Sequence, residues 1–454
     1  RSGHVTGVQT CALPILLNFK NIAREELSFC PGINALVGDN GAGKTNILDA
    51  VYYLSMCKSA LQMTDGQSIR HGEEFFLLEG RYATDAGRRE TIVCSFSRRS
   101  GKLLKRNGKE YDRLSDHVGL IPAVIVSPAD SALISDAADE RRRYLNAFIS
   151  QLDRPYLQAV MRYNAVLAER NRLLKMHPDE TMLAIYDMQL CEHGRLIHAR
   201  RRDFVERLQP VVERYYRMLA EDREQVELSY RSELNNRPFE EVLRDARQKD
   251  LVNEFTTAGI HRDDLVLKIG GYPLRKYGSQ GQQKSFLIAL KLAQYAIVAE
   301  ERHERPILLL DDLFDKLDAG RVEQLIRLVS EATFGQIFIS DCNPTRLKTI
   351  LDRSGGDYAL FTVTNGCVTQ ERQAAEGFDE TDETDETSVA GETGDIDEPG
   401  ETGDTNKTDQ ASEMGDTYAT GEASVAGKTG NTDEPGEADE STATPPAAKT
   451  DSES

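Results

Sequence analysis

The octapeptide Gly38-Asp39-Asn40-Gly41-Ala42-Gly43-Lys44-Thr45 decides the fold of this chain. It matches the pattern G-x-x-x-x-G-K-[ST], whose glycines let a backbone loop close around phosphate groups. An apolar run at Ile33–Val37 precedes it, and apolar residues at helical spacing follow at Thr45–Ser55. A phosphate-binding loop requires this strand–loop–helix context. The pattern therefore predicts that all eight residues bind ATP, with Lys44 on the β- and γ-phosphates and Thr45 on Mg²⁺.

A second, acidic element completes the predicted nucleotide site. Pro306–Asp312 is an apolar strand that ends in two carboxylates, Asp311 and Asp312. Ligands bind at the carboxyl ends of strands in open α/β sheets, so both side chains are expected beside the loop. We predict that Asp311 holds Mg²⁺ through water and that Asp312 is the catalytic residue that polarises the attacking water. Taken alone, the two acids also fit a strand end or a helix cap.

A third block, Gly278–Lys284, precedes a strongly apolar helical pattern at Gln282–Glu300. Small residues before a helix N-terminus form an anion site. Ser279 is expected both to cap the helix and to donate to phosphate. On its own, this block also fits an ordinary turn.

Around these blocks the chain has the pattern of an α/β protein. Residues 139–254 are mainly helical in pattern, and Pro155, Pro178, Pro210 and Pro238 are expected to break them into the separate helices of a compact lobe. Asn107-Gly108 predicts a tight hairpin turn. The predicted strands are 16–19, 33–37, 75–82, 91–97, 102–106, 109–111, 264–269, 307–310, 337–340 and 361–364.

Composition divides the chain into five parts. Residues 16–138 and 255–373 are expected to form the two halves of one ATPase head with an antiparallel β subdomain, and residues 139–254 the helical lobe inserted between them. Residues 1–15 are expected to be a foreign or artefactual segment, because the sequence begins at Arg1 and not at Met. The apolar run Cys11–Leu17 within and after them is too short for a signal peptide and lacks its basic leader. Residues 374–454 hold 24 of the 75 acidic residues and 3 of the 55 basic ones, with almost no large apolar residue. Such a segment cannot offset its ordering entropy, so a disordered acidic tail is expected.

Net charge, cysteine spacing and the length of apolar runs limit the classes of function that this chain can have. The net charge of −20 belongs to the tail, and the nearly neutral body neither demands nor excludes nucleic acid. None of the seven cysteines has Cys-x-x-Cys spacing, which argues against a zinc or redox motif. No apolar run reaches the ~18 residues of a membrane helix. We expect reduced thiols and a cytoplasmic protein.

The order of these blocks resembles that of the ABC-type ATPases of chromosome maintenance, and most closely the RecF family of bacterial DNA repair proteins. The resemblance covers about residues 16–370. The combination is specific, although only the first glycine-rich loop is specific alone. The blocks that carry it are Asn18–Asn21, Gly38–Thr45, Ser127–Asp130, Gln189-Leu190, Gly259–Asp264, Ser279–Lys284 and Asp311–Asp318.

This resemblance implies a DNA-binding ATPase that dimerises when ATP is bound. Ser279, Gly281 and Gln282 would meet the γ-phosphate held by a second copy, and Asp318 would line that interface. ATP would close a DNA clamp and slow hydrolysis would release it, because only ATP offers a γ-phosphate to the second subunit. The resemblance also implies RecO and RecR as partners, and a role in RecA loading at gaps, in replication restart and in SOS induction.

Three positions depart from the family pattern. Ile260 stands where proline is common before His261. Asp341 begins a segment that replaces a common histidine, and Asp312 stands where many relatives have glutamate. The last two departures predict slow ATP hydrolysis.

Three basic clusters are candidates for contact with DNA phosphates. No zinc-finger, recognition-helix or aromatic-stacking signature is visible, so backbone recognition is favoured over base reading. Each cluster fits a solvated charged face about as well. The clusters are Arg98, Arg99, Lys102, Lys105, Arg106 and Lys109; Arg141–Arg143; and Arg195 with Arg200–Arg202.

Two other function classes compete with this interpretation. An ABC-type ATPase subunit of a transporter would share the loop, but the long helical insertion between Thr45 and Ser279 is unlike the shorter spacing of such subunits. A small-molecule P-loop kinase or GTPase would lack the Ser279 block and the paired aspartates. No guanine-reading Asn-Lys-x-Asp segment occurs either.

Overall fold

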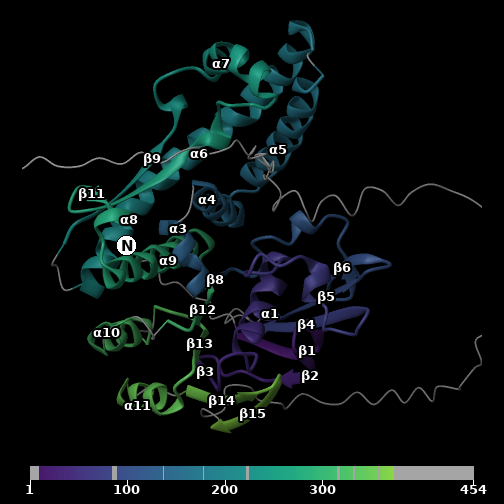
Figure 1. Cartoon of the computed structure of the whole chain (residues 1–454). Coiled ribbons are helices and arrows are strands. Elements are labelled where there is room, and N and C mark those ends of the chain that lie inside the picture. The colour runs from purple at the N-terminus through teal and green to yellow at the C-terminus, as the bar shows by residue number, and fades with distance from the viewer. Residues whose placement is uncertain are drawn as a thin grey trace, which may run out of the picture. The chain divides into compact units, whose positions relative to one another are not determined.

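The computed structural model describes residues 10–83, 89–135, 138–176, 178–220, 224–313, 317, 319–330, 333–354 and 358–372. These residues form three sheets with helices around them (Figure 1). The expected acidic tail, 374–454, and residues 1–9 of the expected foreign segment lie outside the described residues.

A six-stranded sheet in the order β15-β14-β3-β13-β12-β8 carries the nucleotide chemistry. Five of its strands are mutually parallel, and β15 pairs antiparallel with β14 at one edge. Every residue of β3, β8, β12 and β13 is buried, as expected for strands covered on both faces. The strands are β3 (Ile33–Val37), β8 (Ala123–Val126), β12 (Ile307–Asp311), β13 (Ile337–Asp341), β14 (Tyr358–Thr364) and β15 (Cys367–Arg372).

An antiparallel sheet and helix α1 (Lys44–Met56) cover one face of this parallel sheet. Alternate strand residues such as Leu36, Leu309 and Phe338 share a hydrophobic cluster with α1 and with the antiparallel sheet. The sheet order is β2-β1-β4-β5-β6-β7. Its strands are β1 (Thr10–Phe19), β2 (Ile22–Leu27), β4 (Phe75–Ala83), β5 (Arg89–Ser97), β6 (Gly101–Arg106) and β7 (Lys109–Glu110), with the short helix α2 (Asp65–Ser68) before β4.

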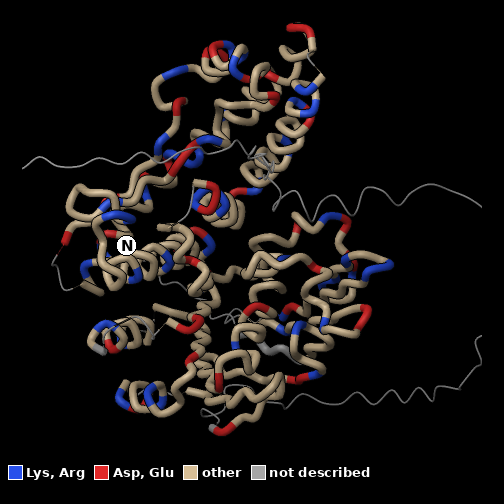
Figure 2. Tube along the Cα trace, viewed as in Figure 1, with Lys and Arg blue, Asp and Glu red and all other residues tan. Residues whose placement is uncertain are grey.

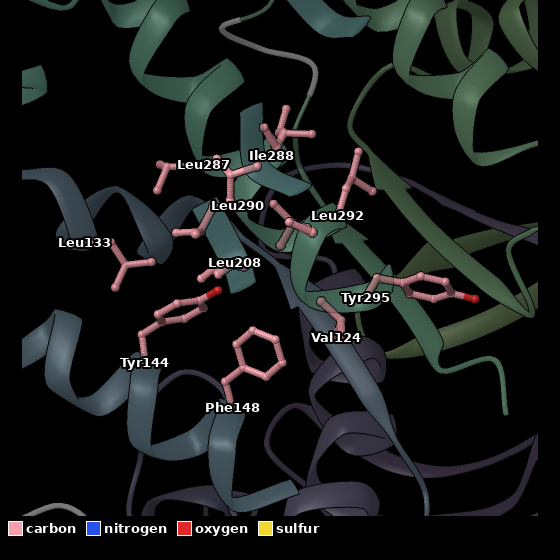
Figure 3. Packing of buried hydrophobic residues seen from close by; sticks show 14 of the residues in the cluster. Val124, Leu133, Tyr144, Phe148, Leu208, Leu287, Ile288, Leu290, Leu292 and Tyr295 are labelled. Atoms are coloured by element: carbon pink, nitrogen blue, oxygen red, sulfur yellow. The ribbon is translucent and has the colours of Figure 1, made fainter. Parts of the chain in front are cut away.

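Helices cover the other face. Strand residues of opposite orientation, such as Ala35, Leu308 and Leu310, pack into a second cluster with these helices. Figure 3 shows side chains from β8, α4, α9 and the long helix α6 (Glu180–Ala220) meeting in that cluster, among them Val124 and Phe148. The helices involved are α3 (Ala132–Ser135), α4 (Ala138–Leu152), α9 (Gln280–Arg302), α10 (Ala319–Val329) and α11 (Pro344–Ser354).

The inserted lobe is built on a long helix, α6 (Glu180–Ala220), which contacts both α5 (Arg154–Leu174) and α9. Helix α7 (Phe239–Asn253) contacts α6 as well. A three-stranded sheet, β11-β10-β9, connects the lobe to α8 (Leu274–Tyr277) and α9. Its strands are β9 (Val226–Arg231), β10 (Asp264–Ile269) and β11 (Tyr272–Pro273).

The expectation that four prolines break the lobe is wrong for Pro210. Pro155 lies in the first turn of α5, Pro178 precedes α6 and Pro238 precedes α7, but Pro210 lies inside α6. Its neighbour Gln209 bonds the backbone of β9, donating to the Val226 carbonyl at 3.1 Å. Packing of α6 against β9 and α9 thus outweighs the local cost of proline.

The predicted fold class is confirmed in its architecture: an α/β head with an antiparallel β subdomain and an inserted helical lobe. The strands at 33–37 and 264–269 have the predicted bounds. Strands β2, β8, β9, β11 and β15 were not predicted. Four-residue β8 is too short for apolar periodicity to distinguish it from other buried segments.

Candidate nucleotide-binding site

The loop between β3 and α1 has a backbone that only glycine accepts at two positions. Gly38 has φ of 149°, and a Cβ there would lie 2.2 Å from the Val363 carbonyl oxygen. Gly43 has φ of 120°, and its Cβ would lie 2.9 Å from the Asn21 amide. Larger residues would therefore push the loop away from its supports. The glycines keep the loop tight enough for its N–H groups to face an anion.

Lys44 is the first residue of α1 and is 6% exposed. Its Nζ donates to the carbonyl oxygens of Gly38 at 2.7 Å and Asp39 at 2.9 Å. The ammonium group is thus held against the loop, at the N-terminus of a helix whose dipole also favours an anion. This is the position from which the side chain can contact phosphates.

Thr45 and Asp311 meet across the sheet. The Thr45 hydroxyl donates to Asp311 Oδ1 at 2.9 Å, and the Ser340 hydroxyl donates to the same oxygen at 2.6 Å. Burial raises the pKa of Asp311, while the hydrogen bonds from Ser340 and Thr45 oppose that rise. Strand β13 separates β3 from β12 and brings Ser340 between the loop and the carboxylate. Sequence reasoning assigned Ser340 no role, since a serine at a strand end carries no distinctive signal.

Asp312 follows β12 in a left-handed conformation with φ of 47°, which is uncommon outside glycine. Its N–H donates to the Ser340 hydroxyl at 3.0 Å. Oxygen and sulfur atoms of Asp312, Asp341 and Cys342 lie within 4.8 Å of one another. Asp341 is buried and pairs with Arg346 at 2.7 Å. The site therefore gathers three carboxylates at the carboxyl edge of the parallel sheet.

These residues fit a magnesium-bound nucleoside triphosphate. Hydroxyl and carboxylate oxygens are the ligands that Mg²⁺ prefers in proteins. Thr45 provides a hydroxyl and Asp311 a carboxylate, and these two oxygens lie 2.9 Å from each other. The close approaches at Gly38 and Gly43 hold the loop against Val363 and Asn21. Together they form half of a phosphate and metal site.

The turn between β1 and β2 braces the loop from outside. Asn21 donates to the Ala42 carbonyl at 3.0 Å and accepts from the Asn46 amide at 2.7 Å. Lys20 forms a buried ion pair with Asp49 of α1 at 2.6 Å. Sequence reasoning placed Asn18–Asn21 in a family block without giving these residues a task. The only signal in the sequence was the place of these residues in that block. The contacts of Asn21 with Ala42 and Asn46 join segments that are far apart in the sequence, so no local pattern predicts them.

The predicted signature residues lie at the start of α9. The exposed Ser279 caps the helix, accepting from the Gln282 N–H at 3.3 Å, while Gln282 Oε1 accepts from the Ser279 N–H at 2.6 Å. A Cβ on Gly281 would come 3.1 Å from Arg321. Within the described residues, no hydrogen bond or ion pair joins Ser279, Gly281 or Gln282 to the loop at Gly38–Thr45. Asp318 lies outside the described residues.

Most of the basic residues suggested for DNA contact are engaged inside the protein. Figure 2 shows acidic and basic residues interspersed along the lobe. Arg141 pairs with Asp264 at 2.7 Å, and Arg201 is buried beside Asp263. The prediction that these two arginines are available to DNA is therefore wrong. Further cations with carboxylate partners are Lys102 (Asp65), Arg106 (Glu90), Arg142 (Asp139), Arg143 (Glu140), Arg195 (Glu240), Arg200 (Asp153) and Arg202 (Asp203).

No helix in the described part of the chain is both long enough and apolar enough to span a membrane.

Fold and site together define an ABC-type P-loop ATPase: a parallel sheet with the phosphate loop after β3, paired acids at the end of β12, and a capped signature helix after an inserted lobe. A family model described as an AAA domain matches residues 15–258. The chain is 44% identical over 364 residues to the DNA replication and repair protein RecF of Phocaeicola vulgatus, covering 80% of this chain and 98% of that protein. It is 47% identical over 352 residues to RecF of Parabacteroides distasonis, covering 77% and 96%.

Solved structures agree with these relatives. A structure of the recombination mediator protein RecF with ATP, in the RecFOR pathway, matches with a TM-score of 0.73 at 29% identity, covering 82% of this chain and all of that one. The chain belongs to the RecF family of DNA replication and repair proteins. Membership in this family disfavours the transporter-subunit and kinase alternatives.

Proposed function

We propose that this chain is an ATP-dependent DNA-binding protein of recombinational repair and replication restart. Two copies dimerise on ATP into a clamp around DNA. The observation that carries this proposal is the separation of the two halves of the nucleotide site. The phosphate loop is fully built in one copy, while Ser279, Gly281 and Gln282 lie exposed or half-buried at the start of α9, with no bond to that loop among the described residues. A second copy supplies the missing half.

In this proposal ATP links the two copies of the chain that form the clamp. Gly38–Thr45 bind its phosphates, Thr45 and Asp311 hold Mg²⁺, and Asp312 polarises the attacking water. Ser279 of a second copy then binds the γ-phosphate, and Asp318 lines the interface between the two copies. Hydrolysis removes the γ-phosphate and, with it, the contact between the two copies. Slow hydrolysis through Asp312 therefore releases the clamp and is not a product-forming activity.

The β5–β6 hairpin is the DNA-facing surface that the charges favour. Arg98, Arg99, Lys105 and Lys109 form no ion pair with carboxylates among the described residues, in contrast to the arginines of the lobe. Arg98, Arg99 and Lys109 are exposed. Such cations bind phosphates without reading bases, so affinity arises from released counterions.

Partners follow from the family. The matched RecF structure is named a recombination mediator of the RecFOR pathway, which supports RecO and RecR as partners of this chain. Loading of RecA at gaps, SOS induction and a cytoplasmic location belong to the same proposal. The acidic tail has no assigned part in it.

Nucleotide-dependent DNA binding tests this function. Full-length protein is titrated with a gapped duplex in ATP, in ADP and without nucleotide, and binding is followed by fluorescence anisotropy. We expect tight binding in ATP only, and affinity that falls steeply with salt because several phosphates are neutralised. Equal binding in all three states, or none in ATP, would overturn the proposal.

A further inference from the structure

Two tyrosines beside the signature helix are exposed to an extent unusual for aromatic residues. Tyr272 is 59% and Tyr277 is 63% exposed. Their rings contact each other, with centroids 5.0 Å apart and planes inclined by 40°. Neither hydroxyl forms a hydrogen bond with another described residue. An apolar ring pair left in water without a polar anchor marks a binding surface.

The ring pair stands on a rigid support. Gly270 and Gly271, both with positive φ, form the tight turn that pairs Ile269 with Tyr272. Leu274, between the two tyrosines, is fully buried. The exposed rings are thus held in place and do not sit on a free loop.

The same support connects the ring pair to the signature. The Gly278 N–H donates to the Leu274 carbonyl at 2.9 Å, which closes α8. Gln283, in the first turn of α9, donates from Nε2 to the Gly278 carbonyl at 2.9 Å. Tyr277 is therefore fixed two residues before Ser279, the cap of α9. Whatever meets Ser279 also approaches the ring pair.

Charge around the ring pair favours an anion. Arg275 and Lys276 lie between the tyrosines in sequence and are both exposed. Among the described residues neither forms an ion pair or a hydrogen bond. Aromatic faces with neighbouring cations bind nucleobases and their phosphates.

The groove next to the phosphate loop lacks an aromatic pair of this kind. It is about 850 Å³ in volume and is lined by polar and basic side chains such as Lys20, Asn46 and Arg70 together with the apolar Met63 and Ile69. In the described part of the chain, neither tyrosine nor phenylalanine lines this groove, and His71 is its only ring. The loop can hold the phosphates, while the neighbouring groove of the same copy offers one imidazole ring and no pair of phenol rings to the base.

We propose that Tyr272 and Tyr277 stack on the nucleobase of the ATP held by the P-loop of a second copy of this chain, with Arg275 and Lys276 attracting its negative charge. The inference rests on the proposed function, since Ser279 must meet that ATP. It assigns base recognition to the partner in the dimer, whereas the loop of the first copy binds the phosphates. Dimerisation then depends on the base as well as on the γ-phosphate.

The test compares purine and pyrimidine nucleotides. Dimerisation of the full-length chain is measured by analytical ultracentrifugation at saturating ATP or UTP. The proteins are the unmodified chain, Tyr272→Ala/Tyr277→Ala and Tyr272→Phe/Tyr277→Phe. In the unmodified chain, ATP should give tighter dimers than UTP. The alanine variant should weaken ATP-driven dimers about tenfold and lose the preference for ATP, because it has no rings to stack on the base. The phenylalanine variant keeps the rings and should keep both properties.

Val252→Ala is the matched control, because Val252 is 83% exposed on α7 and its truncation should change nothing. Equal weakening with ATP and UTP would show a protein contact in place of base stacking. Loss of affinity for an oligo(dT) strand, with dimerisation intact, would show that the rings face DNA. Either result, or unchanged dimers in the alanine variant, overturns the inference alone. An unmodified chain that does not dimerise in ATP overturns the proposed function as well.

Discussion

Asn21 shows how a single side chain joins the antiparallel sheet to the phosphate loop. It bonds the Ala42 carbonyl of the loop and the Asn46 amide of α1 at once. The Gly366 N–H donates to the same carbonyl at 2.7 Å, so the Ala42 peptide is held from two sides. A loop held in this way does not have to be ordered by its ligand, which favours binding.

Replacing Asn21 with alanine should therefore weaken ATP binding without unfolding the head. The substitution removes two hydrogen bonds worth about 1 kcal/mol each, so we expect the Kd for ATP to rise roughly tenfold or more. Isothermal titration calorimetry measures it. Arg24→Ala, on the neighbouring strand β2 with a 71% exposed side chain, is the control. Equal ATP affinity in Asn21→Ala and Arg24→Ala would contradict this role.

Secondary-structure elements divide the basic residues into two functional groups. Arg141 of α4 pairs with Asp264, and Arg201 of α6 pairs with Asp263, so these two arginines join the helices to the segment at β10. Those of the β5–β6 hairpin, Arg98 and Arg99, stay exposed at its turn. The same residue type thus stabilises the fold in one element, and in the other element it is the one we propose for DNA contact.

Variants should separate the two groups. Arg98→Ser/Arg99→Ser should lower DNA affinity and reduce the slope of log affinity against log salt by about one for each DNA phosphate that the protein no longer neutralises, while leaving the melting temperature unchanged. Arg141→Met leaves the buried Asp264 with Arg231 as its remaining partner and should destabilise the fold by about 2 kcal/mol, without changing that slope. Fluorescence anisotropy and urea unfolding measure the two effects. A salt slope that changes only in Arg141→Met would reverse the assignment.

Some elements were easier than others to predict from the local sequence pattern. The strand at Ile33–Val37 and the loop after it were predictable, because apolar runs and glycine motifs are local signals. The paired aspartates at the end of β12 were predictable for the same reason. Asn21 and Ser340 were not, because their contacts depend on strand order. Pro210 was misjudged because packing of α6 overrides local propensity.

In the whole molecule, the chemistry is divided between two distant parts of one chain. The phosphate loop and the acids lie at the edge of the parallel sheet, and the signature caps a helix that follows the lobe. In the proposed dimer, a site divided in this way couples nucleotide binding to dimerisation. ATP would then favour the dimer because it would contact two copies, while ADP lacks the γ-phosphate that the second copy would bind.

Mixing two defective variants tests this central claim most directly. Lys44→Ala removes the loop lysine, and Ser279→Asp keeps the cap of α9 while placing a negative charge where the γ-phosphate should lie. Each variant alone has two broken sites per dimer, whereas the mixed dimer has one intact site. With ATP in an ultracentrifuge, we predict that neither variant dimerises alone and that the mixture does. Dimers of Ser279→Asp alone, or a mixture that stays monomeric while the unmodified chain dimerises, would contradict a site shared between two copies.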